Sequence, residues 1–222
     1  LDSIILKKAS DCDIALLTIG RNSGETLDRD LEKNYHLLPV EVELINRIST
    51  AFHKKGKKLV VVLNVAGVID MNRWEESADG ILLAWQPGQE AGNSVADVLS
   101  GKVNPSGKLA TTFPMRYTDV SSAKNFPGTP VEKPLRVTYQ EGIYVGYRYY
   151  DTFKVPVNYE FGYGLSYTSF AITHFRIEKP SANGSFEVSC NVKNTGKVPG
   201  REVVQVYVSA PVKTLDKPGQ EL

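Results

Sequence analysis

The stretch DCDIALLTIGRNSGETLDR, at residues 11–29, decides the fold. Its first part, residues 14–19, is an almost continuous apolar run, a composition typical of strands buried on both faces in a parallel sheet. Its second part, from Gly20 to Arg29, is a loop of glycine, polar and charged residues. The stretch therefore predicts a buried parallel strand whose carboxyl end opens into a charged loop.

The elements that follow continue an α/β pattern. Apolar residues at helical spacing occupy residues 42–52, with Pro39 suited to the first turn and Gly56 suited to the stop. Two further apolar runs and one more helical pattern follow, at residues 59–63, 80–85 and 91–99. This order predicts an α/β fold with an open, mostly parallel sheet and helices on both faces.

The second half of the chain has a different character. Residues 114–170 are rich in proline and hold most of the chain's 11 tyrosines, so we expect this passage to wrap the α/β layer with its rings packed against it. From about residue 171 polar and apolar residues alternate, which predicts strands at 186–192 and 203–208. Only about three strands fit before Leu222, whereas a β-sandwich needs about seven. We therefore expect a truncated sandwich.

Composition and charge exclude several classes of function. The chain has 222 residues with 26 basic and 25 acidic side chains, and its net charge of +1 favours neither a nucleic-acid partner nor an acidic membrane surface. No apolar run reaches the roughly 18 residues of a membrane span. The two cysteines are far apart, and the three histidines lack further ligands at metal-binding spacing. We expect no disulfide, no metal and no cofactor.

The loop after the first strand is the candidate catalytic segment. Ligands of open α/β sheets bind beyond the carboxyl ends of parallel strands, which is where this loop begins. Gly20 and Gly24 allow backbone angles that other residues resist, so the loop can deliver Glu25 as a proton donor. We expect Asp28 and Arg29 to pair and hold the shape of the loop. The residues alone leave open that the loop is only a connection.

Two rival motifs fit poorly. A serine nucleophile elbow requires the pattern G-x-S-x-G, and Ser23 stands one place late between Gly20 and Gly24. A dinucleotide-binding loop requires three glycines before a helix, and Gly162 and Gly164 have no third glycine after them. Both functions are disfavoured.

Six segments in fixed order carry a resemblance to a known family. They are GRNSGETLDR (20–29), VVVLNVAGVID (60–70), ILLAWQPGQEAGNSVADVLSGKVNPSGKLATTFP (81–114), YQEGIYVGYRYYD (139–151), YEFGYGLSYTSF (159–170) and NTGKVPGREVVQVYVSAP (194–211). Together they resemble the C-terminal half of a glycoside hydrolase of family 3, the β-glucosidase type. The resemblance extends over nearly the whole chain.

The resemblance implies a division of the chain. Members of this family have an N-terminal (β/α)₈ barrel, an α/β sandwich domain and, in many cases, a fibronectin-III-like β-sandwich. By this resemblance residues 1–113 form the α/β sandwich domain without its first strand. Residues 114–170 form a Tyr- and Pro-rich segment packed on that domain, and residues 171–222 form an incomplete fibronectin-III-like β-sandwich.

The resemblance also implies an activity and its residues. The family hydrolyses terminal β-D-glucosides or related β-glycosides with retention, using an Asp nucleophile on the barrel. In the subgroup that this chain resembles, the general acid/base is the Glu of a Ser-Gly-Glu loop. That motif matches Ser23, Gly24 and Glu25, with Asp28 and Arg29 as supporting residues downstream. The following residue, Thr26, stands where the family usually has glycine.

Three hypotheses of function remain. In the first, the chain contributes the acid/base Glu25 to a retaining β-glucosidase that acts on a β-glucoside or oligosaccharide, and is inactive without the missing barrel. In the second, it is a non-catalytic carbohydrate-binding or structural module on the same scaffold, which has no need of a carboxylate at position 25. In the third, the enzyme is a β-xylosidase or another glycosidase, because substrate choice depends on barrel loops.

The two ends of the sequence support further expectations. Leu1-Asp2-Ser3 contains neither an initiator methionine nor a basic region, so we interpret this start as an internal cut. The family resemblance alone suggests a periplasmic or secreted protein. A sandwich with too few strands leaves an apolar face and strand edges open, so we expect self-association of this chain or disorder beyond about residue 171.

Overall fold

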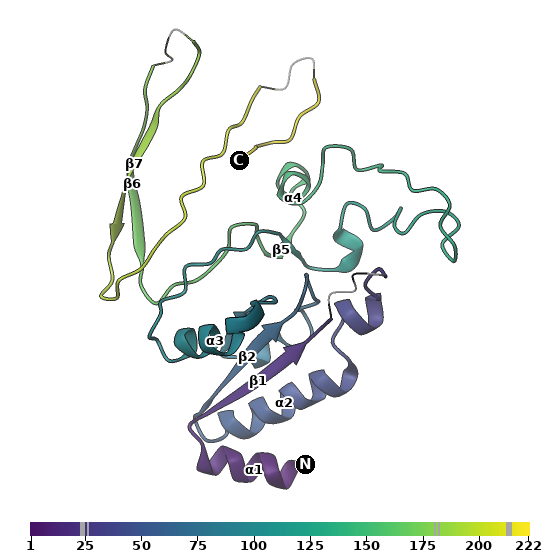
Figure 1. Cartoon of the computed structure of the whole chain (residues 1–222), viewed down its shortest axis with the longest axis vertical. Coiled ribbons are helices and arrows are strands. Elements are labelled where there is room, and N and C mark those ends of the chain that lie inside the picture. The colour runs from purple at the N-terminus through teal and green to yellow at the C-terminus, as the bar shows by residue number, and fades with distance from the viewer. Residues whose placement is uncertain (23–24, 26, 180, 182, 212–214) are drawn as a thin grey trace.

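The centre of the molecule is a small parallel sheet. The structure, a computed structural model, describes residues 1–222 except 23, 24, 26, 180, 182 and 212–214. Strands β1 (Ile14–Gly20), β2 (Lys58–Asn64) and β3 (Gly80–Leu83) lie in the order β1-β2-β3, and both pairs are parallel. Their carboxyl ends therefore meet at one edge (Figure 1). The predicted α/β fold with a parallel sheet is confirmed.

The core lies between this sheet and helix α2 (Pro39–His53). Pro39 occupies the first turn, as predicted, because its missing N–H costs nothing there. The apolar face of α2 presents Ile45, which is fully buried, to the strands. The other core residues come mainly from the sheet and the segment after β2: Ile19, Leu37, Leu59, Val61, Leu63, Val65, Ile69, Met71, Trp74 and Phe113.

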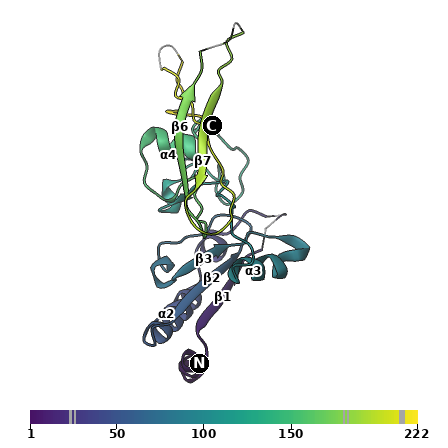
Figure 2. The same ribbon diagram turned by 90° about the vertical axis from the view of Figure 1, so that its left-hand side faces the viewer.

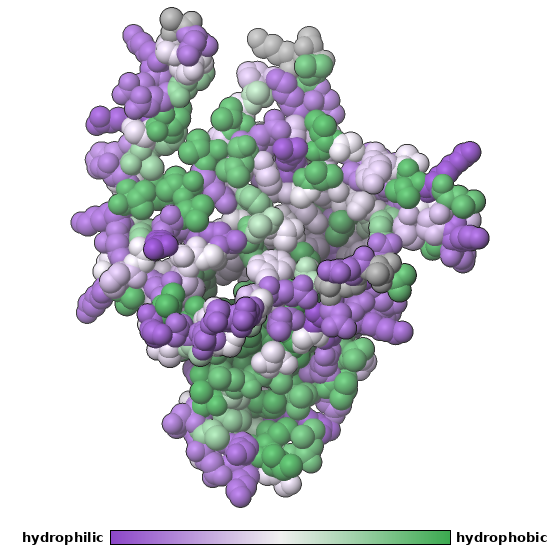
Figure 3. Space-filling view, viewed as in Figure 1, coloured by the Kyte–Doolittle hydropathy of each residue, from purple (hydrophilic) through white to green (hydrophobic). Residues whose placement is uncertain are grey.

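Helix α1 (Asp2–Asp11) was not expected from the sequence. It packs on α2 by a narrow contact, in which Ile5 and Ala9 lie against Ala51 and Phe52. Beyond it, the outer face of β1 remains open, and Leu16 is 56% exposed. Hydrophobic residues accordingly gather on the surface over α1, β1 and α2 (Figure 3).

Helix α3 (Ala91–Leu99) lies on the side of the sheet opposite α2 (Figure 2). A turn through Trp85 and Gly88, both with positive φ, leads into it from β3. No residue of α3 is buried, whereas α2 buries four. The two helices therefore contribute very unequally to the core.

The Tyr-rich passage only partly wraps the α/β layer. Tyr159 donates a hydrogen bond to Glu75 at 2.9 Å, and Tyr167 donates to the Val98 carbonyl at 2.8 Å. Tyr139, in contrast, is 78% exposed. The stretch of chain that leads into α4 (Tyr147–Phe153) makes a long excursion from the body of the molecule (Figure 1). The regular elements of the passage are β4 (Phe113–Pro114), α4 (Tyr147–Phe153) and β5 (Val157–Tyr159), with β4 and β5 antiparallel.

The C-terminal part contains one antiparallel pair. Strands β6 (Phe170–Ile177) and β7 (Val188–Asn194) form a hairpin whose apolar residues are mostly exposed. The prediction of a sheet strand at 203–208 is wrong. Among the described residues, this segment makes only an isolated bridge, between Val208 and Glu221. A strand needs a neighbour along its whole length, and sequence alternation does not supply one. Self-association stays a prediction.

Asn104 ties three distant segments together. Its Oδ1 accepts hydrogen bonds from the Ser166 hydroxyl at 2.9 Å and the Tyr167 N–H at 2.8 Å. Its Nδ2 donates to the Pro199 carbonyl at 3.0 Å. One amide side chain thus links the end of the α/β layer to the Tyr-rich passage and to the turn after β7.

Asp79 links several segments at the amino-terminal edge of the sheet, opposite the charged loop. Its carboxylate accepts hydrogen bonds from Lys58 Nζ at 2.6 Å, the Leu59 N–H at 2.8 Å and, in the tautomer with a proton on Nε2, His53 at 2.8 Å. The bond from Lys58, followed by those from Leu59 and His53, holds the pKa of Asp79 well below its usual range.

Replacing Asp79 by asparagine is expected to lower the free energy of unfolding by roughly 1–3 kcal/mol at pH 7. Because the pKa is depressed in the folded state, this stabilisation is complete above the unfolded pKa of about 3.9 and is lost as the pH falls further. Urea unfolding at a series of pH values should show the difference between wild type and Asp79→Asn shrinking below about pH 4. A pH-independent difference would contradict this, and exposed Asp13→Asn is the matched control.

Candidate active site

The loop carrying Glu25 leaves β1 at Gly20, at the carboxyl edge of the parallel sheet. The Glu25 side chain is exposed, and none of the other described residues holds its carboxylate by a hydrogen bond or an ion pair. Leu27 is 79% exposed, and Asp28 is exposed as well. Three residues of the expected motif, Ser23, Gly24 and Thr26, lie outside the described residues.

The entry to this loop is fixed by Arg21. Its guanidinium forms a bidentate ion pair with Glu41 at 2.5 and 2.9 Å, and its main-chain N–H donates to the Asn64 carbonyl at 3.0 Å. Glu41 also accepts the Leu38 N–H at 2.7 Å at the start of α2. Burial opposes ionisation of Glu41, but the hydrogen bonds from Arg21 and Leu38 outweigh it and lower its pKa.

The exit from the loop is fixed by Arg29. Its Nη1 donates to the Val68 carbonyl and its Nη2 to the Asn34 carbonyl, both at 2.9 Å. Asn34 belongs to η1 (Leu31–Tyr35), a short π-helical turn, and its Oδ1 accepts the Asp30 N–H at 2.8 Å. Partial burial lowers the pKa of Arg29, and the neighbouring Arg21 charge lowers it further.

The expected pair of Asp28 with Arg29 is wrong. Among the described residues no ion pair joins them, and the Asp28 side chain is exposed. The guanidinium reaches two main-chain carbonyls inside the fold instead. Arg29 therefore supports the loop by a different set of partners from the one expected.

A second cluster, centred on Asp70, lies beneath this loop. The buried Asp70 carboxylate contacts His36 Nδ1 at 2.9 Å and Arg73 Nε at 3.6 Å. Its N–H donates to the Tyr35 carbonyl at 2.8 Å, and its carbonyl accepts Trp74 Nε1 at 2.9 Å. These contacts bind the segment after β2 to η1. Sequence reasoning missed them, because neither His36 nor Asp70 stands in a pattern that indicates pairing.

Buried phenols lie beside this cluster. Burial, followed by the charge of Asp70, raises the pKa of Tyr35 to about 12. Burial likewise raises the pKa of Tyr150 to about 12. The rings of Tyr35 and Tyr117 meet edge-to-face with centroids 5.7 Å apart. These groups stay protonated at neutral pH, so they pack and orient rather than exchange protons.

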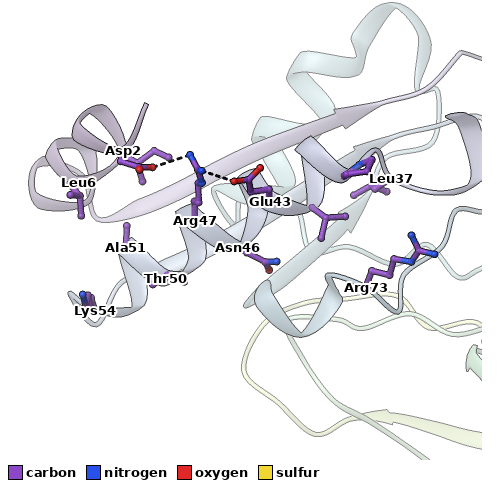
Figure 4. A pocket seen from close by; sticks show the side chains of 13 residues that line it. Asp2, Leu6, Leu37, Glu43, Asn46, Arg47, Thr50, Ala51, Lys54 and Arg73 are labelled. Carbon is purple, nitrogen blue, oxygen red and sulfur yellow. Dashed lines mark hydrogen bonds and ion pairs between the residues drawn. The ribbon is translucent and has the colours of Figure 1, made fainter. Parts of the chain in front are cut away.

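A well-defined pocket lies elsewhere. It has a volume of about 820 Å³ and opens between α1 and α2, and its lining includes no residue of the Glu25 loop. Figure 4 shows Arg47 reaching from α2 to Asp2 and Glu43 along this pocket. A smaller pocket of about 320 Å³ lies between α4, the β5 region and the C-terminal segment, with Thr112 among its lining residues. Neither pocket holds the predicted catalytic group.

Other kinds of site find no support in the part of the chain that the structure describes. No group of three or more His, Cys, Asp or Glu side chains there could hold a metal ion. None of its helices has the length and apolar character needed to cross a membrane. What the arrangement does offer is two solvent-facing carboxyl groups, Glu25 and Asp28, on a loop anchored at both stems, and such a group can transfer a proton to or from a group outside this chain.

Comparison with known proteins gives this arrangement a context. Residues 2–147 match the glycosyl hydrolase family 3 C-terminal domain. The chain is 36% identical to beta-glucosidase A of Butyrivibrio fibrisolvens, over 100% of this chain and 31% of that protein. It is 37% identical to the exo-alpha-(1->6)-L-arabinopyranosidase of Bifidobacterium longum, over 100% of this chain and 28% of that protein.

A solved structure agrees with these relatives. Beta-glucosidase 3B from Thermotoga neapolitana in complex with glucose is similar to this chain with a TM-score of 0.96 and 48% identity, over 100% of this chain and 31% of that one. The chain thus spans about a third of the length of the proteins it matches. The resemblance inferred from the six sequence segments is confirmed: the chain belongs to glycosyl hydrolase family 3.

Proposed function

We propose that this chain supplies Glu25 as the general acid/base of a retaining β-glucosidase. The observation that carries the proposal is the exposed Glu25 carboxylate at the carboxyl edge of the sheet, on a loop whose two stems are anchored by Arg21 and Arg29. Relatives that are β-glucosidases support the reaction class.

The proposed reaction needs a second carboxyl group, from an Asp on a (β/α)₈ barrel outside this chain. Retaining glycosidases place their two carboxyl groups about 5–5.5 Å apart. Glu25 donates its proton to the glycosidic oxygen as the bond to the anomeric carbon breaks, and the Asp forms an ester to that carbon. The Glu25 carboxylate then takes a proton from water, whose oxygen attacks the same carbon and releases the Asp.

The substrate is proposed to be a terminal β-D-glucosyl residue of a glucoside or oligosaccharide. The relative named as an arabinopyranosidase supports a second candidate within the same reaction class. Because α-L-arabinopyranosides also carry an equatorial leaving group, one acid at position 25 suits both sugars. A β-xylosidase is a further possibility of the same kind. Hydrolysis rates of the complete enzyme on the three aryl glycosides decide among them.

The antiparallel hairpin β6–β7 is proposed to belong to a fibronectin-III-like β-sandwich. Its support is the alternation of exposed apolar residues along both strands, including Ile172 and Val192, which are paired across the ladder. An apolar face of this kind packs against a second sheet in such sandwiches. A structure of the complete protein tests this assignment.

The 222-residue chain alone is expected to show no β-glucosidase activity, because the proposed nucleophile lies outside it. The measurement is turnover of a chromogenic aryl β-glucoside by the purified chain, with the complete enzyme as positive control. Turnover by the chain that disappears in Glu25→Gln would contradict the expectation. Turnover that survives this change would indicate a contaminating enzyme.

The alternative of a non-catalytic module is tested in the complete enzyme. Glu25→Gln keeps the size of the side chain and removes its ability to donate or accept the reacting proton. A module that only binds carbohydrate would retain its affinity for glucose and have no activity to lose. A proton donor would lose hydrolysis selectively on substrates with poor leaving groups.

A further inference from the structure

The contact between Arg29 and the turn after β2 places a tight demand on one neighbouring residue. A Cβ atom built on Gly67 would lie 2.5 Å from Nη1 of Arg29 and 3.4 Å from its Cζ. The 2.5 Å distance is well inside van der Waals contact, so Nη1 of the guanidinium occupies the space that any side chain at position 67 would need. Moving Nη1 away would break its 2.9 Å hydrogen bond to the Val68 carbonyl.

Backbone conformation does not explain the glycine at this position. Gly67 is not among the glycines with positive φ, so its backbone accepts an L-residue such as alanine. The remaining reason for glycine is the room that it leaves for the guanidinium. Position 67 is therefore coupled to Arg29 by sterics rather than by its own torsion angles.

The guanidinium is also held without a carboxylate. Arg29 uses two nitrogens for the carbonyls of Val68 and Asn34, and among the described residues no acidic side chain pairs with it. Two carbonyls on different segments require the planar fork of arginine, whereas the single ammonium of lysine does not span both. The geometry of the fork, more than its charge, joins the loop to the turn.

We propose that Gly67 provides the space in which the Arg29 guanidinium lies. The two are then positioning residues that determine where the loop places the Glu25 carboxyl group. The proposal rests on the function proposed for Glu25. Arg29 follows Glu25 by four positions, so its anchor fixes the exit stem of the segment that carries the carboxyl group. A displacement of about 1 Å at a reacting group can cost on the order of 10²-fold in rate.

The test is a double-mutant cycle in the complete enzyme, with Gly67→Ala, Arg29→Ala and the double variant. Each single change is expected to lower kcat/KM roughly 10- to 100-fold on an alkyl β-glucoside and much less on a dinitrophenyl glucoside. Without the guanidinium, position 67 has room, so adding Gly67→Ala to Arg29→Ala should change kcat/KM by less than about twofold. Arg29→Lys should behave like Arg29→Ala.

Controls separate positioning from general damage. Gly92→Ala adds a methyl group to α3 in open space and should leave kcat unchanged. Arg47→Met removes an exposed arginine on α2 that pairs with Asp2 and Glu43, and should also be neutral for kcat. A purely structural role would lower kcat/KM on both substrates alike. It would also lower the melting temperature in proportion to the loss of rate.

Several results would overturn the proposal. The first is an equal loss from Gly67→Ala with and without Arg29, and the second is full activity of Arg29→Lys. Hydrogen exchange of the amides at residues 27–30 provides a readout that needs no activity: both single variants should exchange faster, and the double variant no faster than Arg29→Ala. If Glu25→Gln shows no selectivity for the leaving group, the proposed function fails. Hydrogen exchange in the single and double variants still tests whether Gly67 makes room for Arg29.

Discussion

In the complete enzyme, Glu25→Gln is expected to slow hydrolysis of alkyl β-glucosides by roughly 10²–10⁴-fold. Such leaving groups depart only when protonated, and Glu25 is the exposed carboxyl group of the anchored loop that we propose as the proton donor. A dinitrophenyl leaving group departs without a proton, so its release should hardly change. The measurement is kcat/KM across a series of aryl and alkyl glucosides, plotted against the pKa of the leaving group.

Two features make this result specific for position 25. Azide needs no general base, so it should restore turnover of the dinitrophenyl glucoside by Glu25→Gln and yield a β-glucosyl azide. Glu32→Gln, a nearby exposed carboxylate in η1, is the matched control and should behave like wild type. A uniform loss across the whole leaving-group series would exclude Glu25 as the proton donor.

Trp74→Ala is expected to lower the free energy of unfolding of this chain by about 3–5 kcal/mol. Trp74 is only 2% exposed and is the largest side chain of the core, and its Nε1 donates to the Asp70 carbonyl. Its loss leaves a cavity and removes this hydrogen bond. Urea unfolding followed by far-UV circular dichroism measures the change without relying on tryptophan fluorescence.

Two further variants serve as controls for Trp74→Ala. Tyr139→Ala removes another aromatic ring, but this ring is largely in solvent, so the change should stay within about 0.5 kcal/mol. Trp74→Phe retains most of the packing and loses the N–H, so it should fall between wild type and alanine. A loss below 1 kcal/mol for Trp74→Ala would show that the core does not depend on this ring.

The sequence predicted the centre of the fold because its apolar patterns are a strong local signal, although β1 buries only Ile19 and has one face open. The apolar runs of β1, β2 and β3 have no polar face, and α2 has both helical spacing and a proline at its start. Helix α1 lacked such a signal, since only Ile5 and Ala9 of its ten residues are buried. Its place depends on a contact with α2 that local sequence does not encode.

The candidate site was predictable to a similar extent. The position of Glu25 followed from the rule that loops at carboxyl ends of parallel strands carry ligands, and from the family motif. The partners of Arg29 did not, because main-chain carbonyls such as those of Val68 and Asn34 leave no trace in the identity of the residue. The same holds for the contact of His36 with Asp70, whose residues lie 34 positions apart.

The linking amide of Asn104 has a consequence for chemical durability. Asparagine deamidates when the N–H of the next residue attacks its side chain, and here the next residue is Pro105, which has no N–H. The side chain that holds Ser166, Tyr167 and Pro199 is thus shielded from the commonest spontaneous ageing reaction of proteins. On long storage, damage should instead begin at Asn183-Gly184, in an exposed turn between β6 and β7.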